Sequence, residues 1–302
     1  MRYNTVMETS EVEKLLEGTQ YERFCGTLQK LEFKGYVYND LFKIGNENLG
    51  YFVLKIRKKD TKNFMDSINC LKIANDVENI INKNCGIIEN GNYVIAISEW
   101  LNGKLPTDNN RDTLPLFFSR LAAFNKNNVV DGPYTSMYLD SKFFDSADEL
   151  IDWEINYHRK YFFKKMDTKK ITGILGNLKH GITCIINEDM NCGNLFITDD
   201  AQYKIIDTEW IIRGVNLYQF QHINYFGFDE KTWYNITDEA KDCYEAYFGT
   251  LRIGRAEANE QIRAIELLNV LRTNSFLKSS KKDDDEEIER RLEIVMGKER
   301  YI

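Results

Sequence analysis

The stretch from residue 182 to residue 210 constrains the fold more than any other part of the chain. An apolar run leads into a polar loop, and two short runs rich in β-branched and aromatic residues follow at 195–198 and 203–206. Asp199 and Asp200 separate the two runs and are turn-forming residues. The pattern therefore predicts a β-hairpin with a polar loop directly before it.

The polar side chains of this stretch are predicted to meet. If the hairpin folds about Asp200 and Ala201, Asn194 lies directly opposite Asp207, with the two Cβ atoms about 5 Å apart. A carboxylate beside an amide oxygen suits a hard cation such as Mg²⁺, which also retains water and phosphate oxygens. Asp189 lies five residues before Asn194. This arrangement predicts phosphoryl transfer, and the alternative is a surface hairpin whose Asp, Asn and Gly residues only form turns.

Two segments of the same stretch resemble the catalytic region of the aminoglycoside phosphotransferase and choline kinase-like family, which includes spore-coat-type kinases. The sequence DMNCGN, from Asp189 to Asn194, resembles the catalytic loop of that family. The sequence IDTEW, at 206–210, resembles its metal-binding segment. The resemblance implies that Asp189 is the catalytic base and that Asn194 and Asp207 hold Mg²⁺.

The chain departs from the family pattern just before the catalytic loop. Asn187 and Glu188 stand where the family usually has His-Gly. Because that His is mainly a structural support, we expect an active enzyme with an altered loop. The alternative is a pseudokinase, a scaffold that binds nucleotide without catalysis.

The first hundred residues predict a small lobe built on an antiparallel sheet. A helix that ends at Gly18 comes first, and three strand-like runs joined by short turns follow. Next come a helix, whose apolar positions step by three and four, and two more strands. The expected strands are 26–33, 39–45, 50–59, 86–88 and 93–97, and the expected helix is 61–83.

The rest of the chain predicts a larger and mainly helical lobe. The expected helices are 111–125, 147–165, 169–180, 217–226, 238–248, 256–275 and 285–296. We therefore predict an α+β fold of the two-lobed protein-kinase-like type, in which residues 1–98 form the nucleotide-binding lobe and 99–302 the catalytic lobe. The resemblance to the family covers about 26–226.

Lys55 lies in the third predicted strand of the small lobe. The resemblance implies that Lys55 pairs with the α- and β-phosphates of the nucleotide, whereas an isolated Lys in a strand more often protects a sheet edge. Arg57 shares its face of the strand. The following helix should supply an acid that holds Lys55, either Asp76 or Glu78, and we favour Glu78 because its side chain is longer.

Three further positions are expected to contact the nucleotide. Gly35 occupies the loop between the first two strands, where backbone N–H groups are able to reach phosphate oxygens, although a single Gly in a hairpin is usually only a turn. The segment SEWLNGK, at 98–104, resembles the hinge between the lobes. The resemblance implies that the carbonyl of Ser98 and the N–H of Trp100 bind the purine edge. A plain strand-to-helix connection is the alternative.

Composition narrows the class of protein and its partners. The chain of 302 residues has 43% hydrophobic residues and no apolar run near the ~20 residues that cross a bilayer. Its six cysteines are scattered without a C-x-x-C pair, which predicts reduced thiols in a cytoplasmic protein. The net charge of −7 argues against nucleic acid as a partner.

The phosphoryl acceptor is predicted less directly. Glu209 and Trp210 follow the metal-binding Asp and are expected to line a pocket for an amine, although residues of these types more often have a structural role. We therefore expect an ATP- or GTP-dependent, Mg²⁺-requiring kinase. Its expected acceptor is the hydroxyl of a small molecule that bears an amine, such as an aminoglycoside, choline or ethanolamine, or an amino sugar.

Overall fold

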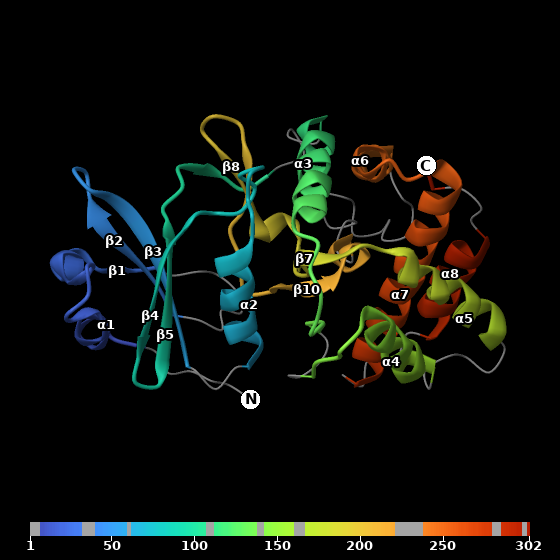
Figure 1. Ribbon diagram of the computed structural model, residues 1–302, viewed down its shortest axis with the longest axis horizontal. Helices are drawn as coiled ribbons and strands as arrows, with labels where there is room; N and C mark the ends of the chain where they lie inside the picture. Colours follow the sequence, from blue (N-terminus) through green and yellow to red (C-terminus); the bar gives the residue numbers. More distant parts are fainter. Residues whose placement is uncertain are drawn as a thin grey trace.

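The computed structural model describes residues 7–31, 40–58, 62–106, 112–137, 142–159, 167–220, 238–279, 285–297 and 301–302. Gly35 lies outside these residues. The described elements form two groups side by side, one built on a sheet and the other mainly helical (Figure 1). This arrangement confirms the predicted α+β class with two lobes. The exact division at residue 98 stays a prediction.

The first lobe contains a five-stranded antiparallel sheet in the order β1-β2-β3-β5-β4. Its strands are β1 (Gln29–Lys30), β2 (Asp40–Asn46), β3 (Gly50–Lys58), β4 (Asn84–Asn90) and β5 (Tyr93–Glu99). The predicted order of three strands, a helix and two strands is therefore confirmed. β1 is shorter than predicted, because a 3-10 helix (Glu22–Thr27) occupies the start of the expected strand.

The two faces of this sheet have different roles. Phe42 and Leu54 belong to a buried cluster that also contains Leu16 of helix α1 (Thr9–Leu16), so α1 covers one face. Lys55 and Arg57 lie one and three residues after Leu54 in the strand. Because side chains alternate along a strand, they point to the face of the sheet opposite Leu54. That face is turned toward helix α2 and the second lobe (Figure 1).

Helix α2 (Lys62–Ile73) is ten residues shorter at its end than the predicted helix 61–83. After it, Ile80 accepts a hydrogen bond from the N–H of Ile205 at 2.7 Å, so the chain pairs with the second lobe instead of continuing as a helix. Asp76 supports this extended path by accepting the N–H of Ile80 at 2.9 Å. Val77, an apolar residue within the predicted helix 61–83, is 70% exposed.

The helices of the second lobe follow the predicted order. They are α3 (Leu114–Asn127), α4 (Ala147–Arg159), α5 (Thr168–Gly176), α6 (Asp238–Leu251), α7 (Arg255–Ser279) and α8 (Asp285–Gly297). Of the predicted helix 217–226, the described part is a 3-10 helix (Asn216–Phe220).

Two small sheets carry the stretch from residue 182 to residue 210. β7 (Thr183–Asn187) pairs with β10 (Ile211–Val215), a strand that the sequence analysis did not predict. The predicted hairpin is present as β8 (Leu195–Thr198) and β9 (Tyr203–Ile205), and β6 (Gly103–Lys104) extends it.

The register of the hairpin differs from the prediction by one residue. Leu195 pairs with Ile205, so the hairpin is centred on Asp200, and Ala201 takes up the left-handed backbone conformation with φ of 61°. The carbonyl of Asn194 accepts the N–H of Ile206 at 2.9 Å. The prediction that Asn194 lies directly opposite Asp207 is therefore wrong, because the turn contains one residue more than we assumed.

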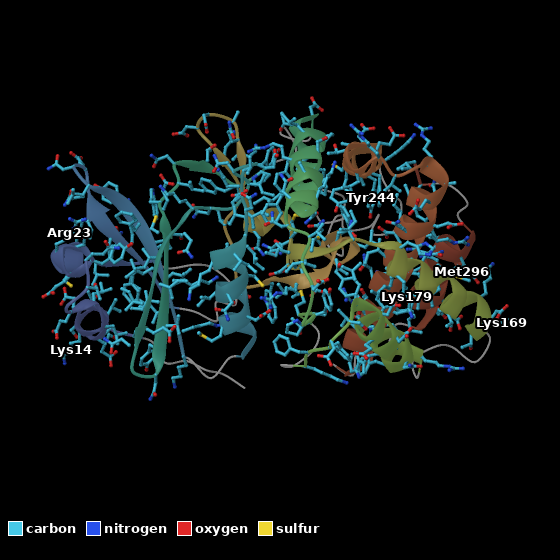
Figure 2. All side chains as sticks on the ribbon, in the orientation of Figure 1. Lys14, Arg23, Lys169, Lys179, Tyr244 and Met296 are labelled. Carbon is cyan, nitrogen blue, oxygen red and sulfur yellow. The ribbon has the colours of Figure 1, made fainter. Side chains whose placement is uncertain are left out.

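The large core lies in the second lobe. Its helices contribute aromatic side chains that pack against one another, such as Phe220 edge to face against Tyr247 with ring centroids 4.7 Å apart. The side chain of Tyr244 lies inside this lobe, whereas those of Lys14, Arg23 and Lys169 lie at the two ends of the molecule (Figure 2). In the described parts of the chain, none of the helices has the length and apolar character needed to span a membrane.

Two leucines of α3 provide a test of this core. Leu121 is 1% exposed and Leu116 is 67% exposed on the same helix. Leu121→Ala should lower the free energy of unfolding by about 2–5 kcal/mol, because it leaves a cavity, whereas Leu116→Ala should change it by less than about 0.5 kcal/mol. Urea unfolding followed by circular dichroism measures both values. Equal effects of the two substitutions would contradict the position of α3.

Candidate active site

Asp189 lies on the loop between β7 and β8, and side-chain amides orient its carboxylate. Asn194 donates to its Oδ2 at 3.0 Å, and Asn191 donates to its Oδ1 at 3.1 Å. Asn194 also donates to the Asp189 carbonyl at 2.7 Å. The loop therefore closes on itself and brings Asp189 and Asn194 together, as the sequence predicted.

Asp207 lies beside this loop and contacts the first lobe. Its Oδ1 atom accepts hydrogen bonds from Lys55 Nζ at 2.9 Å and from the N–H of Glu209 at 3.1 Å. Burial raises the pKa of Asp189 to about 6, and the negative charge of Asp207 adds to this rise. The structure therefore brings Asp189, Asn194, Asp207 and Lys55 into one group.

Asn187 joins the two segments that carry the group. Its Nδ2 donates to the carbonyl of Asp207 at 2.7 Å, and its Oδ1 accepts the N–H of Asp189 at 3.0 Å. The side chain is only 3% exposed. Asn187 therefore gives this loop structural support at the position where the family usually has His.

Glu188 anchors the same loop to the second lobe. Its carboxylate accepts hydrogen bonds from the hydroxyl of Ser136 at 2.7 Å and the N–H of Met137 at 2.6 Å. It also lies 3.2 Å from Arg272, which pairs with Glu154 at 2.6 Å. Burial raises the pKa of Glu188 to about 7, although the positive charge of Arg272 opposes this rise.

The acid that holds Lys55 is Glu209, at 2.5 Å, and the prediction of Glu78 or Asp76 is wrong. Because α2 ends at Ile73, both predicted acids lie beyond the helix. The backbone carbonyl of Glu78 accepts a hydrogen bond from the guanidinium of Arg120, and Asp76 stabilises the chain that follows the helix.

Glu209 is not a free carboxylate of an acceptor pocket, so that prediction is also wrong. It is 7% exposed, and its second oxygen pairs with Arg57 at 3.0 Å. Two cations already neutralise its charge, so it lacks the negative charge that an amine would need. Trp210 is half-buried, and its carbonyl accepts the N–H of Glu188 at 3.0 Å. A contact between its ring and the acceptor stays a prediction.

The hinge segment is only partly available to a purine. The N–H of Trp100 donates to the carbonyl of Tyr51 at 3.0 Å, which extends the β3–β5 ladder by one residue. The prediction that this N–H binds the purine edge is therefore not supported. Ser98 lies in β5 between β3 and β4, and the role of its carbonyl stays a prediction.

Sequence reasoning missed two ion pairs beside this group. The first is the pair of Arg57 with Glu209. Strand alternation placed Arg57 on the same face as Lys55, but Glu209 was predicted to line the acceptor pocket. Asp66 of α2 pairs with Arg213 of β10 at 3.1 Å. No sequence signal indicated this pair, because β10 was not predicted.

The group fits a magnesium ion that arrives with a nucleotide. Within the described ranges, no set of three or more His, Cys, Asp or Glu side chains is arranged to hold a metal ion. Asp207 and Asn194 together offer a carboxylate and an amide oxygen, and Mg²⁺ usually takes few protein ligands and keeps phosphate oxygens and water in its shell. The charge of Asp207 that raises the pKa of Asp189 also favours a cation here.

Comparisons with known proteins identify the fold. No family model matches the sequence, and no curated protein is similar to it in sequence. A thermostable mutant of the aminoglycoside phosphotransferase APH(4)-Ia, in a ternary complex with AMP-PNP and hygromycin B, is similar in structure, with a TM-score of 0.60. The chain has the fold of the small-molecule kinases. The identity is 16%, and the similarity covers 95% of this chain and 98% of that chain.

Two other small-molecule kinases support the same conclusion. The ethanolamine kinase of Plasmodium vivax has a TM-score of 0.55 at 15% identity, with 98% of this chain and 95% of that chain covered. An amicoumacin kinase bound to AMP-PNP and Ca²⁺ has a TM-score of 0.54 at 11% identity, with 97% of both chains covered. The resemblance that the sequence motifs predicted is thus confirmed at the level of the fold.

Glu188 should make the stability of the protein depend on pH. Its pKa is about 7 in the folded protein against an ordinary 4.5, so the folded state binds more protons between these values. The free energy of unfolding should therefore fall as the pH rises through this window, by up to about 3 kcal/mol. Glu188→Gln should flatten this dependence in urea unfolding between pH 5 and pH 8.

Glu149→Gln is the matched control, since Glu149 is an exposed residue of α4. This substitution should not change how the free energy of unfolding varies with pH. A Glu188→Gln variant with the wild-type slope would show that Glu188 does not cause the dependence.

Proposed function

We propose that this chain is a kinase that transfers the γ-phosphoryl group of ATP or GTP to a hydroxyl of a small molecule. One observation carries the proposal: Asp189, Asn194, Asp207 and Lys55, from separate segments, form one group on the fold of the small-molecule kinases. Phosphoryl transfer depends almost entirely on positioning and charge compensation, which these residue types supply.

Lys55 is the residue that we assign to the phosphates of the nucleotide. Burial alone would lower the pKa of Lys55, but the carboxylates of Asp207 and Glu209 outweigh it, and its pKa is raised. The ammonium is therefore charged at neutral pH. Mg²⁺ held by Asp207 and Asn194 would neutralise further phosphate charge when it binds with the nucleotide.

Asp189 is the residue that we assign as the base. Its pKa of about 6 leaves the carboxylate ionised at neutral pH, yet basic enough to accept the proton of an attacking hydroxyl. The amides of Asn191 and Asn194 fix the direction of its two oxygens. Asp189 therefore orients the acceptor hydroxyl and takes its proton as the phosphoryl group transfers.

The acceptor that we propose is a small alcohol that also bears an amine. The kinases of similar fold act on ethanolamine or have been captured with hygromycin B, and the net charge of −7 favours a cationic substrate. Glu209 no longer supports this proposal, because Lys55 and Arg57 neutralise it. We further propose a cytoplasmic protein that acts without nucleic acid or membrane partners.

Asp189→Asn tests the proposed reaction. The variant should bind nucleotide as the wild type does, because Asp189 carries none of the predicted phosphate contacts. Its turnover should fall by about 10²–10⁴-fold, the usual contribution of a positioned proton acceptor. The measurement is transfer of radioactive phosphate from γ-labelled ATP or GTP to a panel of amino alcohols, choline analogues, amino sugars and neutral sugars.

The outcomes of this panel separate the possible functions. A neutral sugar as the best acceptor would overturn the amine-bearing acceptor but leave the kinase. Nucleotide binding by the wild type without transfer to any acceptor would favour the pseudokinase. Near wild-type turnover by Asp189→Asn on the best acceptor would exclude Asp189 as the base.

A further inference from the structure

Glu209 contacts two cations of strand β3 at once. One carboxylate oxygen lies 2.5 Å from Lys55 Nζ, and the other lies 3.0 Å from Arg57 Nη1. Both cations are on the face of the sheet that looks toward the second lobe, two residues apart in the chain. Arg57 therefore fixes the orientation of the carboxylate that holds Lys55.

The backbone of Glu209 is held on both sides of its side chain. Its N–H donates to Asp207 Oδ1 at 3.1 Å, and its carbonyl accepts the hydroxyl of Ser67 on helix α2. The contact with Ser67 ties this segment to the helix that packs on the sheet. The position of the carboxylate is thus set by the fold and does not depend on a bound ligand.

Helix α2 offers no carboxylate of its own to Lys55. Asp66 is the only acidic residue in the helix, and it pairs with Arg213 at 3.1 Å. Because the side chain of Lys55 is only 16% exposed, its ammonium needs a carboxylate partner throughout the reaction. Asp207 cannot keep this role once a metal ion occupies it, since the metal and the ammonium repel one another.

We propose that Glu209 is a positioning residue that holds the ammonium of Lys55 at the phosphate site while Asp207 holds the metal. This inference rests on the proposed function. The structure gives Lys55 two carboxylate partners, Asp207 and Glu209. The substitution Glu209→Gln leaves only Asp207 of these two. Mg²⁺ and Lys55 then compete for Asp207, so more Mg²⁺ is needed before the nucleotide is bound with its metal.

The test is calorimetric binding of ADP at a series of Mg²⁺ concentrations. In Glu209→Gln, the Mg²⁺ concentration at half-maximal ADP binding should rise by about tenfold to a hundredfold, the usual effect of losing a residue that orients a metal site. Asp66→Asn is the matched control, because it removes a different ion pair between the two lobes, that of Asp66 with Arg213, without touching Lys55. It should leave the Mg²⁺ dependence unchanged.

A double-mutant cycle shows whether Glu209 acts through Lys55. In a Lys55→Met background no ammonium competes for Asp207, so adding Glu209→Gln should leave the Mg²⁺ dependence unchanged. A further rise in that background would mean that Glu209 acts on the metal directly, and it would overturn the inference. An unchanged Mg²⁺ dependence in the single variant would overturn it as well.

Two results distinguish failure of this inference from failure of the proposed function and from misfolding of the variant. A wild-type protein that binds no ADP at any Mg²⁺ concentration would defeat the proposed function itself. If Glu209→Gln does not fold, Glu209→Asp keeps the charge but shortens the reach, and it should raise the Mg²⁺ requirement in the same direction. Wild-type behaviour of Glu209→Asp would then count against the inference.

Discussion

The ammonium of Lys55 lies between the carboxylates of Asp207 and Glu209, and the rest of the site depends on this contact. The two distances are 2.9 and 2.5 Å, and the lysine side chain is only 16% exposed. A buried cation without partners would be strongly destabilising. The contact therefore joins strand β3 of the first lobe to the segment at 207–209.

The loop that carries Asp189 is fixed from two further directions. Asn187 bonds it to Asp207, and Glu188 bonds it to Arg272 on α7, which also holds Glu154 of α4. Removing one member of such a buried ionic group typically costs about 3–5 kcal/mol, because a charge is left without its partner. Asp189 directly follows these two anchors in sequence. Its position is thus determined by the first lobe through Lys55 and Asp207 and by the second lobe through Arg272.

The sequence predicted the parts of the structure that local patterns determine. The helices of the second lobe, the strands of the first and the loop with Asp189 and Asn194 all follow from periodicity, turn residues and a short motif. The register of the hairpin did not, because it depends on the backbone conformation of one turn residue, Ala201. The end of α2 was missed because pairing with Ile205 overrides an apparent helical period.

The partners of charged side chains were the least predictable feature. The choice of Glu78 for Lys55 assumed that the acid would come from the following helix, but the only acid of α2 pairs with a strand 147 residues away. Glu209 was visible in the sequence, two residues after Asp207. Its contact with Lys55 depends on how the two lobes pack together, and no local sequence pattern indicates this packing.

Asp207 is proposed to hold a divalent metal together with the phosphates of a nucleotide. Electron paramagnetic resonance of Mn²⁺, which prefers the same oxygen ligands as Mg²⁺, tests it directly through loss of the signal of free Mn²⁺. The wild-type protein should bind Mn²⁺ much more tightly when ADP is present, and Asp207→Ala should lose this enhancement. Equal ADP-dependent binding of Mn²⁺ by the wild type and by Asp207→Ala would contradict the account.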